Sequence, residues 1–105
     1  MANTKVIDAQ VADAISGVQS LSTPCVIHCS GLQAGDLMVV ETAPSETESE
    51  FVPMGQESII KGSGGGVIVV NVLTGVSYKL RVRFKASTAP GRAALPGASA
   101  YVMTA

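Results

Sequence analysis

Tryptophan is absent from the 105-residue chain, and only four residues are aromatic, although apolar residues make up 47% of the total. The hydrophobic core must therefore be built mainly from aliphatic side chains. Charged residues account for only 14%, against about 25% in a typical domain. The surface is then rich in small uncharged residues, which suits a chain that packs against copies of itself or against a partner.

Further shortages exclude other classes of protein. The chain has no run of about 18 apolar residues, the length of a membrane-spanning helix, and the acidic residues Asp8 and Asp13 interrupt its start. We expect no membrane contact and no secretion signal, and a chain made in the cytoplasm. The formal net charge of −1 argues against a nucleic-acid binder, because positive charge drives such binding. The length fits a single domain.

Alternation of apolar and polar residues gives the clearest local prediction. Along residues 76–87, apolar residues alternate with serine or cationic residues, which predicts a strand with one buried and one cationic face. Further strands are expected at residues 25–29, 36–43, 50–54, 57–62, 66–73 and 100–105. The β-branched run at 66–73 is typical of a strand covered on both faces or placed at a sheet interface. Segments 30–36 and 62–66 are expected to be a loop between neighbouring strands and a flexible turn.

The first twenty residues allow two interpretations. Apolar residues from Ile7 to Val18 have helical spacing, but residues 17–23 could equally form a first strand after a terminal arm. We favour an N-terminal arm (1–12) followed by one β-sandwich domain (13–105). Seven or eight short antiparallel strands, separated by Gly, Pro and Ser turns and without a firm helix, indicate an all-β sandwich or barrel.

Both cysteines and the only histidine lie in the segment Cys25-Val-Ile-His28-Cys29. In a strand the two cysteines share a face but lie about 13 Å apart, and a disulfide needs Cα atoms within about 7 Å. His28 points to the opposite face, so it cannot form a catalytic dyad with Cys29. A zinc site would also need a second ligand pair downstream. We expect two core cysteines, a surface or interface histidine, and no metal or cofactor.

The outward side of segment 76–87 forms a cationic stripe made of Lys79, Arg81, Arg83 and Lys85. We expect either a solvated face or a contact with an acidic surface, such as Glu46, Glu48 and Glu50 of another copy. Nucleic acid is disfavoured because Tyr78 and Phe84 lie on the buried face and cannot stack on bases. The carboxylates do not converge on one point, so we expect neither an enzyme nor a small-molecule substrate.

Residues 27–86 resemble the small β-sandwich proteins of tailed bacteriophages, in which an SGL-x-x-GD-x-V-x-V-E run precedes a middle hairpin and a Y-(K/R)-(L/V)-R-V strand. The matching residues here are Ser30-Gly31-Leu32, Gly35-Asp36, Val39, Glu41 and Tyr78–Val82. The proline-rich segment 88–98 has no counterpart. The resemblance implies an immunoglobulin-like fold and a virion protein that decorates or cements the head as a trimer or larger ring. Its partners would be copies of itself and the major capsid protein or another virion protein.

Two other functions stay open at this point. One is a head- or tail-associated binding module that recognises a carbohydrate or a receptor through exposed aromatic residues. The other is a small metal-binding domain that uses Cys25, His28 and Cys29.

Overall fold

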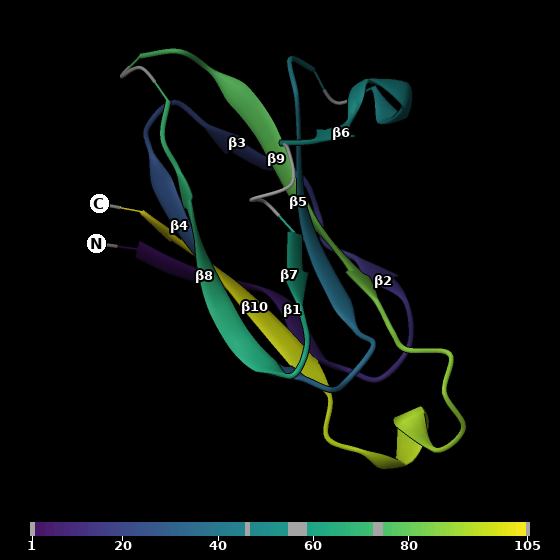
Figure 1. The fold of residues 1–105 in the computed structure, drawn as a ribbon. Helices are drawn as coiled ribbons and strands as arrows, with labels where there is room; N and C mark the ends of the chain where they lie inside the picture. The colour runs from purple at the N-terminus through teal and green to yellow at the C-terminus, as the bar shows by residue number, and fades with distance from the viewer. Residues whose placement is uncertain (1, 46, 55–58, 73–74, 105) are drawn as a thin grey trace.

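The computed structural model describes residues 2–45, 47–54, 59–72 and 75–104. These residues form two antiparallel sheets packed as a β-sandwich (Figure 1), which confirms the all-β prediction. Sheet A contains, in spatial order, β1 (Ala2–Gln10), β10 (Ala98–Thr104), β4 (Cys25–Leu32) and β8 (Gly64–Val70). Sheet B contains β2 (Ala14–Ile15) and β3 (Gln19–Leu21) beside β9 (Tyr78–Lys85), then β5 (Leu37–Ala43), then β6 (Val52–Pro53) and β7 (Ile59–Lys61). Among the described residues, no helix is long and apolar enough to span a membrane.

The strand pairing follows one simple rule, in which the first strand pairs with the last. β1 pairs with β10, β2 and β3 with β9, β4 with β8, and β5 with β6 and β7. The chain is thus one long antiparallel ribbon whose tip is the connection between β5 and β6. Counting β2/β3 and β6/β7 as one strand each, the sheet orders are 1-8-3-6 and 2-7-4-5. This wrapped ribbon of eight strands is a jelly-roll arrangement.

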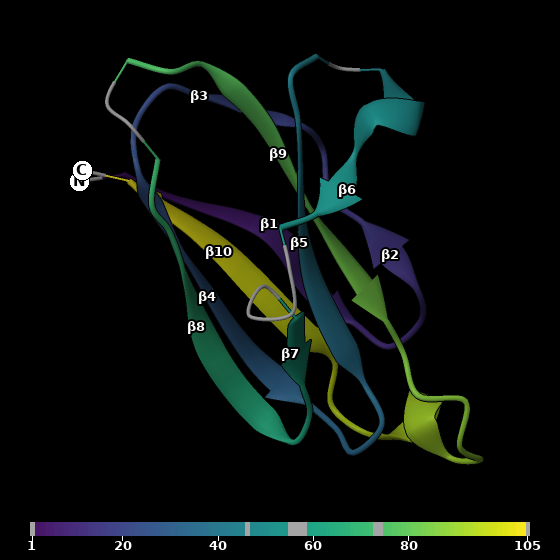
Figure 2. The same cartoon turned by 45° about the horizontal axis from the view of Figure 1, so that its top comes forward.

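The observed strand order differs from the immunoglobulin-like order that the resemblance implied. Immunoglobulin sheets pair strands A with B and E with D, which are consecutive in the chain, whereas here the chain termini pair with each other. The expected N-terminal arm is wrong for residues 2–10, because they form β1 along β10 and Ile7 is buried in the core. Both termini consequently lie side by side at one end of the sandwich (Figure 2).

The core lies between the two sheets and is largely aliphatic, with Phe84 as its fully buried aromatic residue. The inward face of β9 confirms the expected alternation over Tyr78–Lys85. Val76, which was expected on the buried face, precedes the strand and is 50% exposed. Sheet A contributes the inward residues of β4 and β10, from Cys25 to Leu32 and from Ala98 to Val102. The fully buried side chains that meet there include Ile27, Leu32, Met38, Val40, Val70, Leu80, Val82 and Phe84.

Two glycine-containing segments differ from expectation. Gly64–Gly66, expected in a flexible turn, form the start of β8, and a Cβ on Gly65 would collide with the carbonyl oxygen of Cys29. Ser30–Leu32 complete β4. Gly31 has a φ of +76°, and a Cβ there would collide with the carbonyl oxygen of Gly97. The remaining loop, 33–36, crosses from sheet A to sheet B instead of joining neighbouring strands.

Asp36 fixes this crossing at one end of the sandwich, where it is fully buried. Its carboxylate accepts hydrogen bonds from the backbone N–H groups of Gln33 (2.8 Å) and Ser87 (2.7 Å). Arg92, in the 3₁₀ helix η3 (Arg92–Ala94), donates from Nε at 2.9 and 3.0 Å. Its Nη2 lies 2.9 Å from Oδ2 as a charge contact without hydrogen-bond alignment. The 33–36 crossing and the 86–97 crossing back to sheet A are therefore bonded to one carboxylate.

Burial by itself would raise the pKa of Asp36, but the hydrogen bond from Arg92 and those from the two backbone N–H groups outweigh it. The pKa of Asp36 is consequently below its ordinary value. The ionised form is then favoured more strongly in the folded chain than in the unfolded chain.

Replacing Asp36 should show how much the fold depends on this corner. Asp36→Asn leaves the buried Arg92 guanidinium without its counter-charge, so we expect the free energy of unfolding at neutral pH to fall by roughly 3–5 kcal/mol. In the wild type this stabilisation is complete above the unfolded-state pKa of about 3.9 and is lost as the pH falls through the lower folded-state value. Denaturant unfolding across the acid range should therefore give a flatter pH dependence for the variant.

A matched control is the exposed ion pair between Lys5 and Asp8 (2.8 Å). Asp8→Asn should change the stability little, because solvent screens exposed pairs. Equal losses in the two variants would contradict a special role for Asp36.

Candidate interaction surface

The cysteine and histidine segment is divided between the two faces of β4. Cys25 and Cys29 are buried and free, whereas His28 is exposed on the outer side of sheet A. Burial raises the pKa of Cys29 to about 12, and burial also raises that of Cys25, although the hydroxyl of Tyr78 at 3.6 Å opposes the shift. Such thiols stay protonated at neutral pH and are poor nucleophiles and ligands. The described residues contain no cluster of three metal-ligating side chains.

His28 lies at the centre of a surface that we call the apolar face, the outer side of sheet A. The strand register places His28 between Tyr101 and Val67, and it places Val26 between Met103 and Val69. Val67 and Val69 are 57% and 66% exposed. A shallow hollow of about 270 Å³ is lined by Asn3, His28, Tyr101 and Met103. At its margin, Lys5 lies over the Tyr101 ring (5.5 Å) and pairs with Asp8, so this face carries little net charge.

The β8 edge of the apolar face has few of the features that normally prevent strands from pairing with other molecules. β1 carries Lys5, Asp8 and two register irregularities, and the short edge strands of sheet B include Pro53 and Lys61. β8 contains neither charge nor proline, and it pairs regularly with β4 from Gly66 to Val70. The opposite edge of sheet B also lacks charge and proline, but its strands β2 and β3 are only two and three residues long. Among the described edges, β8 is therefore the longest one without charge or proline.

The cationic stripe lies on the outer side of sheet B, but its members differ in their surroundings. Arg81 is buried: its Nε donates to Glu41 at 2.6 Å, and its guanidinium lies 4.3 Å from the centre of the Phe51 ring. The expectation that Arg81 belongs to an open contact surface is therefore wrong, because Phe51 covers it. Arg83 Nε lies 3.4 Å from the other carboxylate oxygen of Glu41.

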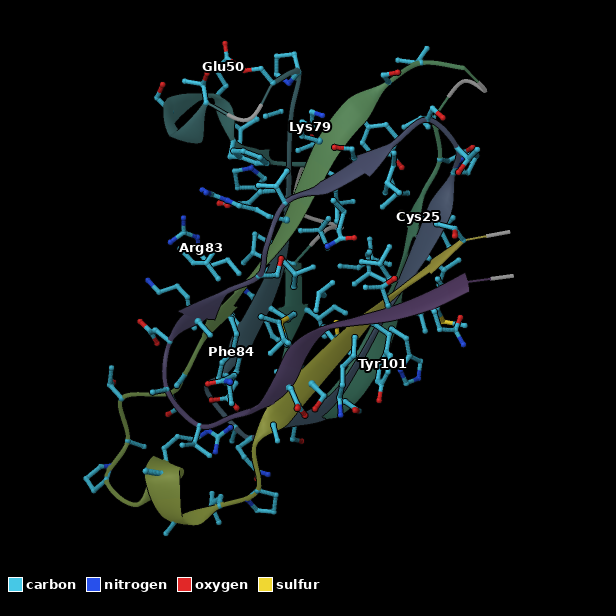
Figure 3. The ribbon with its side chains drawn as sticks, turned by 180° about the vertical axis from the view of Figure 1, so that it is seen from behind. Cys25, Glu50, Lys79, Arg83, Phe84 and Tyr101 are labelled. Carbon is cyan, nitrogen blue, oxygen red and sulfur yellow. The ribbon has the colours of Figure 1, made fainter. Side chains whose placement is uncertain are left out.

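The rest of the stripe is more accessible. Lys79 donates to the hydroxyl of Ser20 at 2.7 Å, and Lys85 is exposed. Figure 3 shows Glu50, Lys79 and Arg83 on the same side of the molecule. Glu50 is exposed and accepts a hydrogen bond from Ser45, Glu48 begins the 3₁₀ helix η1 (Glu48–Glu50), and Glu46 lies outside the described residues. The acidic segment thus begins beside the Lys79 end of its own stripe.

Sequence reasoning missed the two buried ion pairs, because no local pattern shows which cation faces Asp36 or Glu41. Glu41 lies directly opposite Arg81 across β5 and β9, so knowing that these strands are neighbours would have revealed the pair. Arg92 gave no local signal, since it lies in an irregular loop.

The residues that carry the phage-protein resemblance have structural roles here. Gly35 has a φ of +89°, and a Cβ there would lie 2.7 Å from the Ser87 hydroxyl oxygen. Leu32 is buried in the core, and Asp36 and Glu41 are the anions of the two buried ion pairs. In this chain the run from Ser30 to Glu41 therefore serves the fold, because its leucine lies in the core and its two carboxylates lie in buried ion pairs.

Thiol chemistry offers a direct test of the cysteine assignment. Cys25 and Cys29 should react with a chromogenic disulfide reagent far more slowly in the native protein than in denaturant, because both thiols are buried and protonated. Ser30→Cys, on the outward side of the same strand, is the control and should react at once. The double variant Cys25→Ala/Cys29→Ala should lose roughly 1–3 kcal/mol of stability and keep its oligomeric state. Fast native labelling of the two cysteines would contradict their core placement.

Comparison with known proteins adds no assignment to this geometry. No protein-family model, curated protein or solved structure matches the chain. The functional argument therefore rests on the apolar face, the unprotected β8 edge and the distribution of charge.

Proposed function

We propose that the chain is a structural protein of a bacteriophage virion that decorates or cements the head as a homo-oligomer, with a trimer favoured. The observation that carries the proposal is the apolar face, with Val67 and Val69 more than half exposed beside the β8 edge. Exposed apolar surface of this kind marks an interaction site when it is contiguous. Covering the two valines contributes about 1 kcal/mol each.

A structural role is also supported by the buried carboxylates and thiols, because these groups hold the fold together and are not presented at the surface for chemistry. Two of the carboxylates, Asp36 and Glu41, are buried in ion pairs that hold the fold, and the thiols are buried in the core. Jelly-roll arrangements occur in viral capsid and lectin domains, which supports the proposal only by analogy of fold. The partners we propose are copies of the chain and the major capsid protein or another virion protein, without nucleic acid, membrane or a small-molecule substrate.

Quantitative mass spectrometry of purified particles tests the location in the virion. The preparation is the phage whose genome encodes the chain. Hundreds of copies per particle are expected for a decoration protein, and a handful would indicate the tail. Absence of the chain from particles, together with no binding to empty capsids, would overturn the proposal.

Placing a charge on the apolar face should weaken attachment to the capsid. Val67→Lys should lower the affinity for empty capsids at least tenfold, which corresponds to about 1.4 kcal/mol, while the free energy of unfolding stays unchanged. Val76→Lys is a matched control, because Val76 is also half exposed (50%) but precedes β9 and lies outside sheet A and the acidic tip. Co-sedimentation with capsids measures both. Equal affinities for the two variants would show that the apolar face is not the attachment surface.

A second candidate is a module that binds a carbohydrate or a receptor, favoured by the hollow that Tyr101, His28 and Asn3 line. Tyr101 is the one aromatic residue of the four that is not buried. Sugar platforms commonly need stacking aromatics, and a single ring beside Lys5 offers little. We expect no retained ligand on a glycan array; binding that Tyr101→Ala abolishes would favour this second function over the first.

A further inference from the structure

Charge is distributed unevenly over the molecule. Five of the seven cations of the chain lie on the outer side of sheet B, namely Lys61, Lys79, Arg81, Arg83 and Lys85. The segment 44–50, which we call the acidic tip, holds three glutamates and no cation. The chain therefore carries a cationic face and an acidic projection whose charges are opposite.

Within the part of the chain that the structure describes, one end of the cationic face is accessible. Toward the Lys79 end, the guanidinium of Arg81 donates a hydrogen bond to Glu41 and is covered by the ring of Phe51. Lys61 and Lys85 are exposed and flank Leu37 in adjacent strands, and Ile15, 49% exposed, pairs with Arg83 across β2 and β9. We call Ile15, Lys61, Arg83 and Lys85 the open cationic end.

A hollow of about 410 Å³ lies within this end. It is lined by Asp13, Ala14, Ile15, Arg83, Phe84 and Lys85. Asp13 is the one acid among these lining residues, and it already accepts a hydrogen bond from the backbone N–H of Ala86 at 2.8 Å. The hollow therefore combines two cations with an exposed aliphatic side chain.

The acidic tip has the complementary character. Its 3₁₀ helix η1 projects from the end of the sandwich (Figures 1 and 2). Glu50 is exposed on it, and the residues that follow include the exposed apolar side chains Val52 and Met54. Phe51 anchors the tip over Arg81, and Lys85 lies about 13 Å further along β9 at 3.3 Å per residue. The tip is thus held at the far end of its own stripe.

We propose that the acidic tip of one copy binds the open cationic end of the next copy. The inference deepens the proposed self-association, on which it rests, and does not depend on a location in the virion. Because two different surfaces meet, the contact is heterologous, and such contacts close into rings or continue as filaments. Opposite charges accelerate the encounter and make the association weaker at high salt.

Charge reversal in purified full-length protein tests this contact by sedimentation analysis at low and high salt. Lys61→Glu/Lys85→Glu should raise the dissociation constant at least tenfold, and Glu48→Lys/Glu50→Lys should do the same. The variant that carries all four substitutions restores the attraction with reversed polarity and should recover the wild-type association. Circular dichroism and unfolding curves establish that each variant is folded.

The matched control is Lys5→Glu/Lys79→Glu, which changes the net charge by the same amount as Lys61→Glu/Lys85→Glu but lies outside the open cationic end. It should keep the dissociation constant within about twofold of the wild type. An equal loss in this control would overturn the specific contact in favour of a general charge effect, and so would failure of the fourfold variant to recover.

Two other results separate this contact from the proposed function. A wild-type chain that stays monomeric, or an oligomer that ignores all charge reversals but dissociates on Val67→Lys, would overturn the tip contact. The chain could also form an oligomer that responds to the charge reversals as expected and yet be absent from phage particles. That result would support the tip contact and overturn the virion function.

Discussion

The buried carboxylate of Asp36 is the interaction on which the arrangement of the two sheets depends. A jelly roll requires the chain to cross between sheets, and two of these crossings, at 33–36 and 86–97, meet at Asp36. A buried charge is costly unless it is fully paired, so this corner is stable only when the 33–36 turn, the end of β9 and Arg92 are all in place. Gly35 permits the approach, because its φ of +89° and its missing side chain leave room for Ser87. The corner therefore specifies one way of stacking the sheets.

The second buried pair, Arg81 with Glu41, has a comparable role on the outer side of sheet B. It joins β9 to β5 and, through Phe51 over the guanidinium, fixes the root of the acidic tip. The charges of Arg81 and Glu41 therefore neutralise each other within the chain and are not available to a partner. Among the described residues, the surfaces that remain accessible to other molecules are the apolar face, the open cationic end, where Arg83 alone contacts Glu41, and the tip.

The sequence predicted those features that depend on neighbouring residues. Alternation predicted the strand at β9 and its inward side, and apolar runs predicted the strands at β5 and β4. Strand geometry placed both cysteines in the core and His28 outside. Features that depend on distant pairing were missed. Residues 2–10 have a weak pattern of their own and become a strand because β10, at the far end of the chain, pairs with them. Gly64–Gly66 extend β8 because β4 supplies the pairing, which three glycines would not favour alone. Arg81 and Arg92 are buried by segments that no local pattern connects to them. The oligomer and the virion role, which rest on resemblance and exposed surface, stay predictions.

The placement of the two surfaces explains why association between copies would matter for attachment. Tyr101 on the apolar face and Arg83 on the cationic face lie on opposite sides of the sandwich (Figure 3), so one copy can contact a neighbour and a larger surface at the same time. A face of four strands and about five residues presents about ten outward side chains, fewer than the roughly 20–30 residues per side of a stable interface. One copy alone would therefore bind weakly. In a closed ring whose axis runs along the normal of the apolar face, all apolar faces would point the same way. Once one face binds, the others would act at a high effective concentration on a matching symmetric surface. Head-to-tail contacts through the tip would thus convert a weak single face into a tight collective one.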